Sequence, residues 1–206
     1  MVDAACSKAT RDRGRSGSRP VRRRRALAAL AMLLATTAPA AAASEAAAWE
    51  ALRAGAIVLF RHAQAPGGGD PAGMRLGDCA TQRNLDDAGR SQAARIGEAF
   101  RARGIVVGAV LHSAWCRTTD TAELAFPGRG RTEPTFDSFF GDRRSGAART
   151  AAARRVLLDW TGQGALFVST HQVNITALTQ IVPASGEGVV LQRQGQDLAV
   201  IGRIRP

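Results

Sequence analysis

The chain has 206 residues and a formal net charge of +11, but this charge is unevenly distributed. Residues 1–43 hold nine of the 28 basic and two of the 17 acidic residues, so the other 163 residues carry 19 arginines against 15 acids, a net of +4. The body of the chain therefore lacks the strong basic excess of a nucleic-acid-binding domain, and we expect no nucleic-acid partner. Its length fits a single domain, 44–206, with a hydrophobic core.

Residues 1–43 have the pattern of a secretory signal peptide. Four arginines at 22–25 precede an apolar segment at 26–35, and the small residues at 38–40 and 41–43 offer cleavage sites. The alternatives are a basic nucleic-acid arm and an uncleaved anchor, although the uncharged stretch is mostly alanine and at the lower length limit for a span. We predict export to the periplasm or the exterior by the Sec or the twin-arginine route, with no stable membrane insertion after cleavage.

Three cysteines are present, of which Cys6 lies in the predicted signal peptide. An exported protein meets an oxidising environment, which favours a disulfide between Cys79 and Cys116. Two unpaired, partly buried thiols are the alternative.

The first half of the domain alternates helices and strands. Asp86 is a suitable N-cap for a helix whose apolar residues recur at helical spacing and which ends at Gly104. The Gly- and Pro-rich segment 65–77 predicts a loop, and because it follows His62 closely it is expected to border any site there. The predicted elements are a helix at 44–53, a strand at 56–60, the loop at 65–77, a helix from 86 to 104, a strand at 105–111 and a helix at 114–125.

The second half continues this alternation. The predicted elements are an irregular segment at 126–146, a helix at 147–160, a strand at 165–170, a helix at 174–181, and paired strands at 188–192 and 198–204. The strands before 171 are continuously apolar, as in buried parallel sheets. The pattern predicts an α/β fold: a three-layer α/β/α sandwich around a mostly parallel sheet.

His62 and His171 each follow an apolar strand directly. They are found in the strings Leu59-Phe60-Arg61-His62-Ala63 and Val168-Ser169-Thr170-His171. Side chains just beyond the carboxyl ends of parallel strands lie in the crevice where such sheets bind ligands. We therefore expect His62 and His171 to share a site, with Arg61 adding positive charge.

Four motifs in order resemble those of the histidine phosphatase superfamily (phosphoglycerate-mutase-like, branch 1). The Arg61-His62-Ala63 string is similar to its Arg-His-Gly/Ala signature, and Ser169-Thr170-His171 is similar to its second histidine motif. Between them, 85–93 resembles Leu-Thr/Ser-x-x-Gly-x-x-Gln-Ala, and 113–122 resembles Ser-x-x-x-Arg-x-x-x-Thr-Ala. The resemblance covers about 56–181 and implies a phosphoglycerate-mutase-like fold.

The resemblance also implies a chemistry. His62 would attack phosphorus with a neutral ring nitrogen and form a phosphohistidine, its other nitrogen being held by a backbone carbonyl. Arg61, Arg117 and His171, if the last is protonated, would bind and neutralise the phosphoryl oxygens. The expected partner is a small phosphomonoester or phosphate, and no metal or cofactor is implied.

A general acid must protonate the leaving oxygen. Asp137-Ser138-Phe139-Phe140-Gly141 is similar to the family's Glu-x-x-Phe-Gly, so Asp137 is the candidate and Asp142 the runner-up; a solvated carboxylate is the alternative for either.

Four further residues near the predicted site have possible roles. Gln172 and Arg83 are candidate substrate contacts, with helix capping and a surface position as the respective alternatives. Asn174 is expected to cap the helix at 174–181, and His112 to be a bystander.

Two features of the sequence argue against the large acid phosphatase branch of the superfamily. The large acid phosphatase branch has aspartate where this chain has Gln172, and only 53 residues separate Arg117 from His171, too few for a large cap domain. We therefore predict an exported phosphomonoesterase. The alternatives are a phosphohistidine or lipopolysaccharide sugar-phosphate phosphatase and a phosphate-binding module without an effective acid; a mutase is less favoured because export removes it from glycolytic intermediates.

Overall fold

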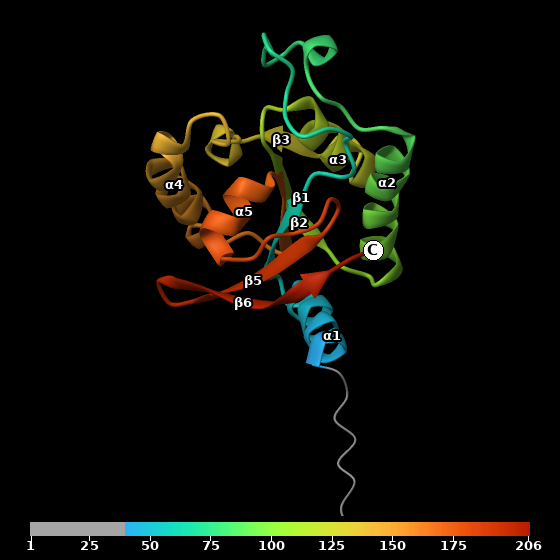
Figure 1. Cartoon of the computed structure of the whole chain (residues 1–206). Helices are drawn as coiled ribbons and strands as arrows, with labels where there is room; N and C mark the ends of the chain where they lie inside the picture. The colour runs from blue at the N-terminus through green and yellow to red at the C-terminus, as the bar shows by residue number, and fades with distance from the viewer. Residues whose placement is uncertain (1–39) are drawn as a thin grey trace, which may run out of the picture. The chain divides into compact units, whose positions relative to one another are not determined.

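The computed structural model describes residues 40–206 (Figure 1), so nearly all of the predicted signal peptide lies outside the described residues. The helices are α1 (Ala40–Arg53), α2 (Asp87–Ala102), α3 (Cys116–Ala125), α4 (Gly146–Leu158) and α5 (Gln172–Thr179). The strands are β1 (Ile57–Arg61), β2 (Val107–His112), β3 (Gly130–Thr132), β4 (Ala165–Thr170), β5 (Gly188–Gln194) and β6 (Asp197–Ile204). None of the helices described combines the length and apolar character that a membrane span needs.

The six strands form one sheet in the order β3-β2-β4-β1-β5-β6. The first four strands in this order run parallel, whereas β5 and β6 form an antiparallel hairpin beside β1. This arrangement confirms the predicted mostly parallel sheet. The carboxyl ends of β1, β2 and β4 consequently meet at one edge.

Each face of the sheet packs against helices through its own hydrophobic core. Successive residues of a strand point to opposite faces. In β1, Val58 and Phe60 pack with α1, α2 and α3, while Ile57 and Leu59 pack with α4 and α5. The same division is visible in Figure 1, where α2 and α3 lie on the other side of the sheet from α4 and α5. The predicted three-layer sandwich is confirmed.

The start of α2 is fixed by two local features. Asp86 is the N-cap, and its Oδ1 accepts a hydrogen bond from the Gly89 amide at 2.7 Å, as the sequence predicts. At Gly89, a Cβ atom would lie 2.0 Å from the carbonyl oxygen of Gln64. Only glycine lets α2 approach the chain this closely just after β1, so Gly89 fixes the helix beside the end of that strand.

Three sequence predictions need correction. The segment 126–146 is not wholly irregular, because it contains β3, whose three residues are too few to show a periodic pattern. Helix α1 begins four residues before the predicted start. Helix α5 begins at Gln172, with His171 at the N-cap position and no capping hydrogen bond from its side chain, so Asn174 is not the cap. Nδ2 of the Asn174 side chain instead donates to the backbone carbonyl of Asp137 at 2.9 Å.

Cys79 and Cys116 form a disulfide, which confirms the predicted pairing. The bond joins the loop between β1 and α2 to the first residue of α3. Beside it, the Cys116 amide donates to Oε1 of Gln82 at 3.0 Å. The loop is therefore fastened to the start of the helix that carries Arg117.

Replacing both Cys79 and Cys116 by serine is expected to lower the free energy of unfolding by about 3–4 kcal/mol. The cross-link spans 37 residues, and removing it restores loop-closure entropy to the unfolded chain. Urea denaturation of the mature protein measures the change, and reduced wild-type protein should match the double variant. An unchanged midpoint would contradict the expectation.

Candidate active site

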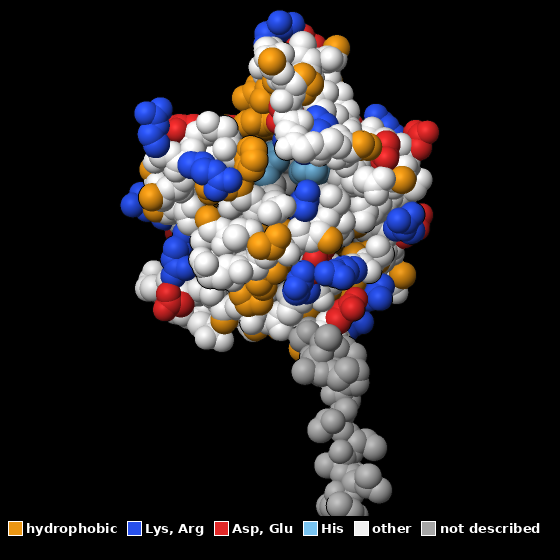
Figure 2. All heavy atoms as spheres, viewed as in Figure 1, with side chains coloured by type: hydrophobic (Ala, Val, Ile, Leu, Met, Phe, Trp, Pro, Cys, Tyr) orange, Lys and Arg blue, Asp and Glu red, His pale blue; other side chains and the backbone are white. Residues whose placement is uncertain are grey.

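Three adjacent parallel strands bring the predicted residues to one edge of the sheet. The His62 amide donates to the Thr170 carbonyl at 2.9 Å, and the Ser113 amide donates to the Ser169 carbonyl at 3.2 Å. The ring centroids of His62 and His171 are 5.6 Å apart. The loop after β1 extends away from the sheet at this edge (Figure 1). Figure 2 shows histidine atoms in a hollow, next to basic and hydrophobic side chains.

The His62 ring is held in one tautomer. Its Nδ1 lies 2.8 Å from the carbonyl oxygen of Ala63, which can only accept, so Nδ1 carries the proton and Nε2 keeps its lone pair. Burial, followed by the charges of Arg117, Arg83 and Arg61, lowers the pKa of His62 to about 3. The imidazole is therefore neutral near pH 7, with Nε2 in the form that a nucleophile requires.

His171 is held by a chain of hydroxyl groups. Its Nε2 lies 2.7 Å from Oγ of Ser113, which lies 2.6 Å from Oγ1 of Thr118. The Thr118 hydroxyl donates to the Trp115 carbonyl at 2.7 Å and so accepts from Ser113. Ser113 in turn accepts from His171, which places the proton of the neutral ring on Nε2 and leaves the lone pair on Nδ1.

The sequence leaves open a protonated His171, but the ring is neutral without an anion. Burial and the charge of Arg117 lower the pKa of His171 well below its ordinary value. A bound phosphoryl group reverses the sign of the local charge and so favours protonation at Nδ1. His171 can therefore take up a proton when an anion arrives.

Three guanidinium groups surround this pair, each with one end held by the protein. Nη1 of Arg61 and Nη1 of Arg83 donate to backbone carbonyls, and Arg117 donates to the carboxylate of Asp70. The Nε of each arginine is buried and has no hydrogen-bond partner among residues 40–206. An unpaired buried donor costs about 1–3 kcal/mol. Three in one cluster indicate a site that an anion completes.

Of the two candidate acids, Asp137 is the one connected to the residues around His171. It is 7% exposed, and its Oδ1 accepts from the Ala114 amide at 2.8 Å, next to the Ser113 that holds His171. Burial raises the pKa of Asp137, which favours the protonated form that an acid must have. Asp142 is exposed near Arg144, and no hydrogen bond connects it to the site residues described here.

The other residues considered from the sequence differ in their position relative to the site. Arg83 lies in the cationic cluster, since its charge lowers the pKa of both His62 and His171. Gln172 is exposed at the first position of α5 and makes no side-chain hydrogen bond within the described part of the chain. His112 is buried at the end of β2, where its Nδ1 contacts the Ser113 carbonyl and Thr119, as expected for a bystander.

Three further side chains contact these groups and were not among the site residues predicted from the sequence. Ser113 holds His171, and the Trp115 ring lies edge-on to His171 with centroids 5.1 Å apart. Asp70 binds Arg117 with both carboxylate oxygens. The position of Asp70 in the loop after His62 was the only available signal.

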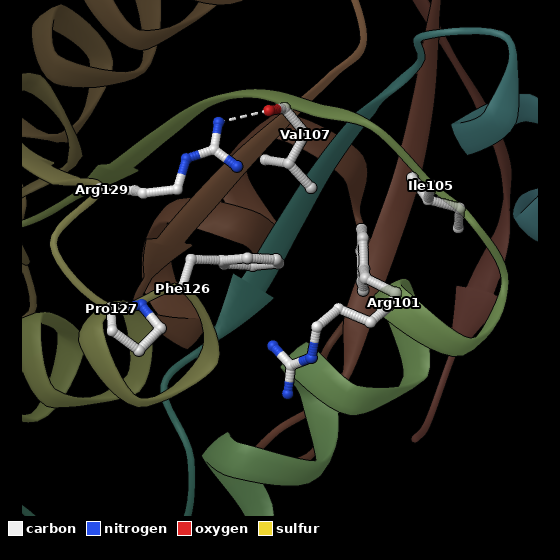
Figure 3. Close-up of a pocket in the computed structure, with 7 residues that line it drawn as sticks. Arg101, Ile105, Val107, Phe126, Pro127 and Arg129 are labelled. Carbon is white, nitrogen blue, oxygen red and sulfur yellow. Dashed lines mark hydrogen bonds between the residues drawn. The ribbon is translucent and has the colours of Figure 1, made fainter.

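A separate apolar pocket does not contribute to this arrangement. Figure 3 shows it between the end of α2, the end of α3 and the start of β2, away from the histidines. Its two arginines, Arg101 and Arg129, already donate to the backbone carbonyls of Ala125 and Val107. The pocket therefore offers no free cationic group for a phosphate.

The low pKa of His62 predicts a loss of stability in acid. Between about pH 6.5 and pH 3 the unfolded chain binds a proton at this residue that the folded chain does not. As the pH is lowered through this window, the free energy of unfolding should therefore decrease, and His62 should contribute about 1.4 kcal/mol of this decrease per pH unit. Denaturation at pH 7, 6 and 5 should show a shallower dependence for His62→Asn. Equal slopes for variant and wild type would contradict the assignment.

Comparison with known proteins agrees with this geometry. Residues 57–151 match the sequence model of the histidine phosphatase superfamily (branch 1). No curated protein sequence matches the chain. The match, together with the phosphatases among the similar solved structures, supports a phosphatase function.

Three solved structures have the same fold at low sequence identity. The SixA protein of Agrobacterium tumefaciens is 19% identical, with a TM-score of 0.53 over 74% of this chain and 98% of its own. A protein histidine phosphatase SixA complexed with tungstate is 14% identical, with a TM-score of 0.53 over 73% and 97%. A mycobacterial glucosyl-3-phosphoglycerate phosphatase is 15% identical, with a TM-score of 0.51 over 70% and 96%.

Proposed function

We propose that the chain is a member of the histidine phosphatase superfamily (branch 1), whose sequence model matches residues 57–151, and that it hydrolyses phosphomonoesters through a phosphohistidine on His62. The observation that carries the proposal is the neutral Nε2 of His62 beside three guanidinium groups whose Nε donors have no partner among the residues that the structure describes. A neutral nucleophile within a cationic cluster suits a phosphate ester, whose negative charge repels anionic nucleophiles.

The reaction divides into two steps. In the first, Nε2 of His62 forms a bond to phosphorus as the bond to the leaving oxygen breaks, and Asp137 gives its proton to that oxygen. Arg61 and Arg117 stabilise the equatorial oxygens, and His171 becomes protonated beside them. In the second, the Asp137 carboxylate takes a proton from water, water oxygen bonds to phosphorus, and the bond from nitrogen to phosphorus breaks.

Hydrolysis of an aryl phosphate in the presence of a chelator tests the activity. A phosphoenzyme that is stable in alkali and labile in acid would identify phosphohistidine. Phosphate binding without turnover on any ester would instead indicate a phosphate-binding module and contradict the proposal.

The substrate class can be identified by comparing several types of phosphorylated compound. Small phosphomonoesters, a lipopolysaccharide sugar phosphate and a phosphohistidine peptide should be compared by kcat/KM. We expect the phosphomonoesters to be preferred. If kcat/KM were more than tenfold higher for the peptide, a protein phosphohistidine would replace phosphomonoesters as the proposed substrate class.

We also propose that the protein acts outside the cytoplasm. The signal-like pattern of residues 1–43 and the Cys79–Cys116 disulfide support this location, because disulfides persist in oxidising compartments. Cell fractionation and N-terminal sequencing should yield an exported protein beginning near residue 41 or 44. An intact N-terminus in the cytoplasm would contradict this.

A further inference from the structure

We propose that Asp70 is a positioning residue that turns Arg117 edge-on toward the phosphoryl group. This inference rests on the proposed function and adds a residue that none of the four family-like motifs contains. Asp70 lies in the loop after β1, 47 residues before Arg117, and binds it in bidentate fashion. The distances are 2.6 Å from Nη1 to Oδ1 and 3.0 Å from Nη2 to Oδ2.

The Asp70 carboxylate is fully used by the protein. Besides the two bonds from Arg117, its Oδ2 accepts from Nε1 of Trp115 at 3.0 Å, and its Oδ1 accepts from the Arg83 amide at 3.3 Å. A carboxylate has about four acceptor positions, so all are occupied. If Asp70 left to make room for a ligand, the Trp115 and Arg83 donors would lose their acceptor. These contacts indicate that the Asp70 carboxylate stays in place when a ligand binds and is not displaced by it.

The contacts also define which part of Arg117 remains free. Nη1 donates to Asp70 and, at 3.4 Å, to the Arg83 carbonyl, while Nη2 gives only one of its two hydrogens to Asp70. The second hydrogen of Nη2 and the Nε hydrogen point from the same edge of the guanidinium plane. That edge is a bidentate fork suited to two phosphoryl oxygens. Its Nε has no partner within the described residues.

Asp70 also sets the charge of the site. Three guanidinium groups and one carboxylate, with both histidines neutral, leave a net charge of two positive. This charge complements a phosphomonoester dianion. The loop that carries Asp70 is itself fixed, because the disulfide joins Cys79 to the residue before Arg117.

Asp70→Asn distinguishes positioning from simple charge. Removing a negative charge should strengthen anion binding if Asp70 acts only through its field or blocks the site. If Asp70 orients Arg117, the same change should weaken binding of inorganic phosphate and lower kcat/KM on an aryl phosphate, each by about 10- to 100-fold. Asp78→Asn is the matched control, because Asp78 is in the same loop and its carboxylate pairs, within the described part of the chain, only with the exposed Arg75. The control should stay within twofold of wild type.

A double-mutant cycle tests whether Asp70 acts through the Arg117 fork. Lysine has no fork, so Arg117→Lys should remove most of what Asp70 contributes. In the Arg117→Lys background, Asp70→Asn should change kcat/KM by less than threefold. Full additivity, or tighter phosphate binding by Asp70→Asn alone, would overturn the proposal.

A measurement on wild-type protein does not depend on variant folding. In a phosphate titration followed by NMR of arginine Nε–H groups, the Arg117 signal, assigned through Arg117→Lys, is expected to shift. Phosphate binding seen at other residues without this shift would overturn the role of Asp70. If wild-type protein neither binds phosphate nor turns over an ester, the proposed function itself fails, and the role of Asp70 fails with it.

Discussion

Replacing His62 by asparagine is expected to lower kcat/KM on an aryl phosphate by at least about 1,000-fold, while inorganic phosphate binding stays within a few-fold of wild type. The nucleophile is lost, because an amide nitrogen has no available lone pair. The arginines that bind the anion keep their protein contacts, since none of them is bonded to the His62 ring. Steady-state kinetics and calorimetric phosphate titration measure the two quantities separately.

His112→Asn provides the matched control for this variant. His112 resembles His62 locally, because it also lies at the end of a buried strand with its Nδ1 2.8 Å from the carbonyl oxygen of the next residue. Its ring, however, contacts Thr119 and lies near Gly130 of β3. We expect kcat/KM within about threefold of wild type. Activity retained by His62→Asn and lost by His112→Asn would exchange the two roles and contradict the mechanism.

The comparison of His62 with His112 shows what the sequence could not decide alone. Both histidines end apolar runs, and only the motif order separated them. The physical difference is strand register. Strands β1 and β2 both border β4, but Arg61 is paired with Thr170, which places His62 beside His171, whereas His112 is paired with Ser169, two residues before His171. Register between distant strands is a long-range property that no local pattern contains.

The fold was predictable wherever a periodic or capping signal exists. Buried strands, the Asp86 cap and the Gly104 end of α2 all follow from local rules, and the structure has them. The short β3 and the Asp70–Arg117 pair were not predictable. β3 has only three residues, and Asp70 lies in a loop whose glycines and prolines carry no periodicity.

The charge state of His171 could not be decided from the sequence for a related reason. A histidine beside a phosphate site suggests a cation, but burial and neighbouring arginines decide its protonation, and both depend on tertiary packing. Arg61 and Arg83 could be named as candidates from the sequence, but the fact that their Nε atoms have no partner within residues 40–206 required coordinates.

Asp137→Asn is expected to lower kcat/KM by about 100- to 10,000-fold on alkyl phosphates but by less than about tenfold on a nitrophenyl phosphate. An alkoxide needs the proton that Asp137 supplies, whereas nitrophenolate leaves readily without it. The ratio kcat/KM is the appropriate quantity, because it reports phosphoryl transfer to His62 and not the later hydrolysis of the phosphohistidine.

The pH dependence of the alkyl reaction provides an independent test of the same acid. Burial raises the pKa of Asp137, so the carboxyl group stays protonated to a higher pH than an exposed aspartic acid, and kcat/KM should fall as pH rises through that pKa. Asp137→Asn should abolish this descending limb. Asp142→Asn, which alters the exposed carboxylate five residues later, should preserve both the limb and the rate within twofold. A proton donor must matter most where the leaving oxygen is most basic. If Asp137→Asn lowered kcat/KM equally on alkyl and nitrophenyl phosphates and kept the descending limb, Asp137 would not be the acid.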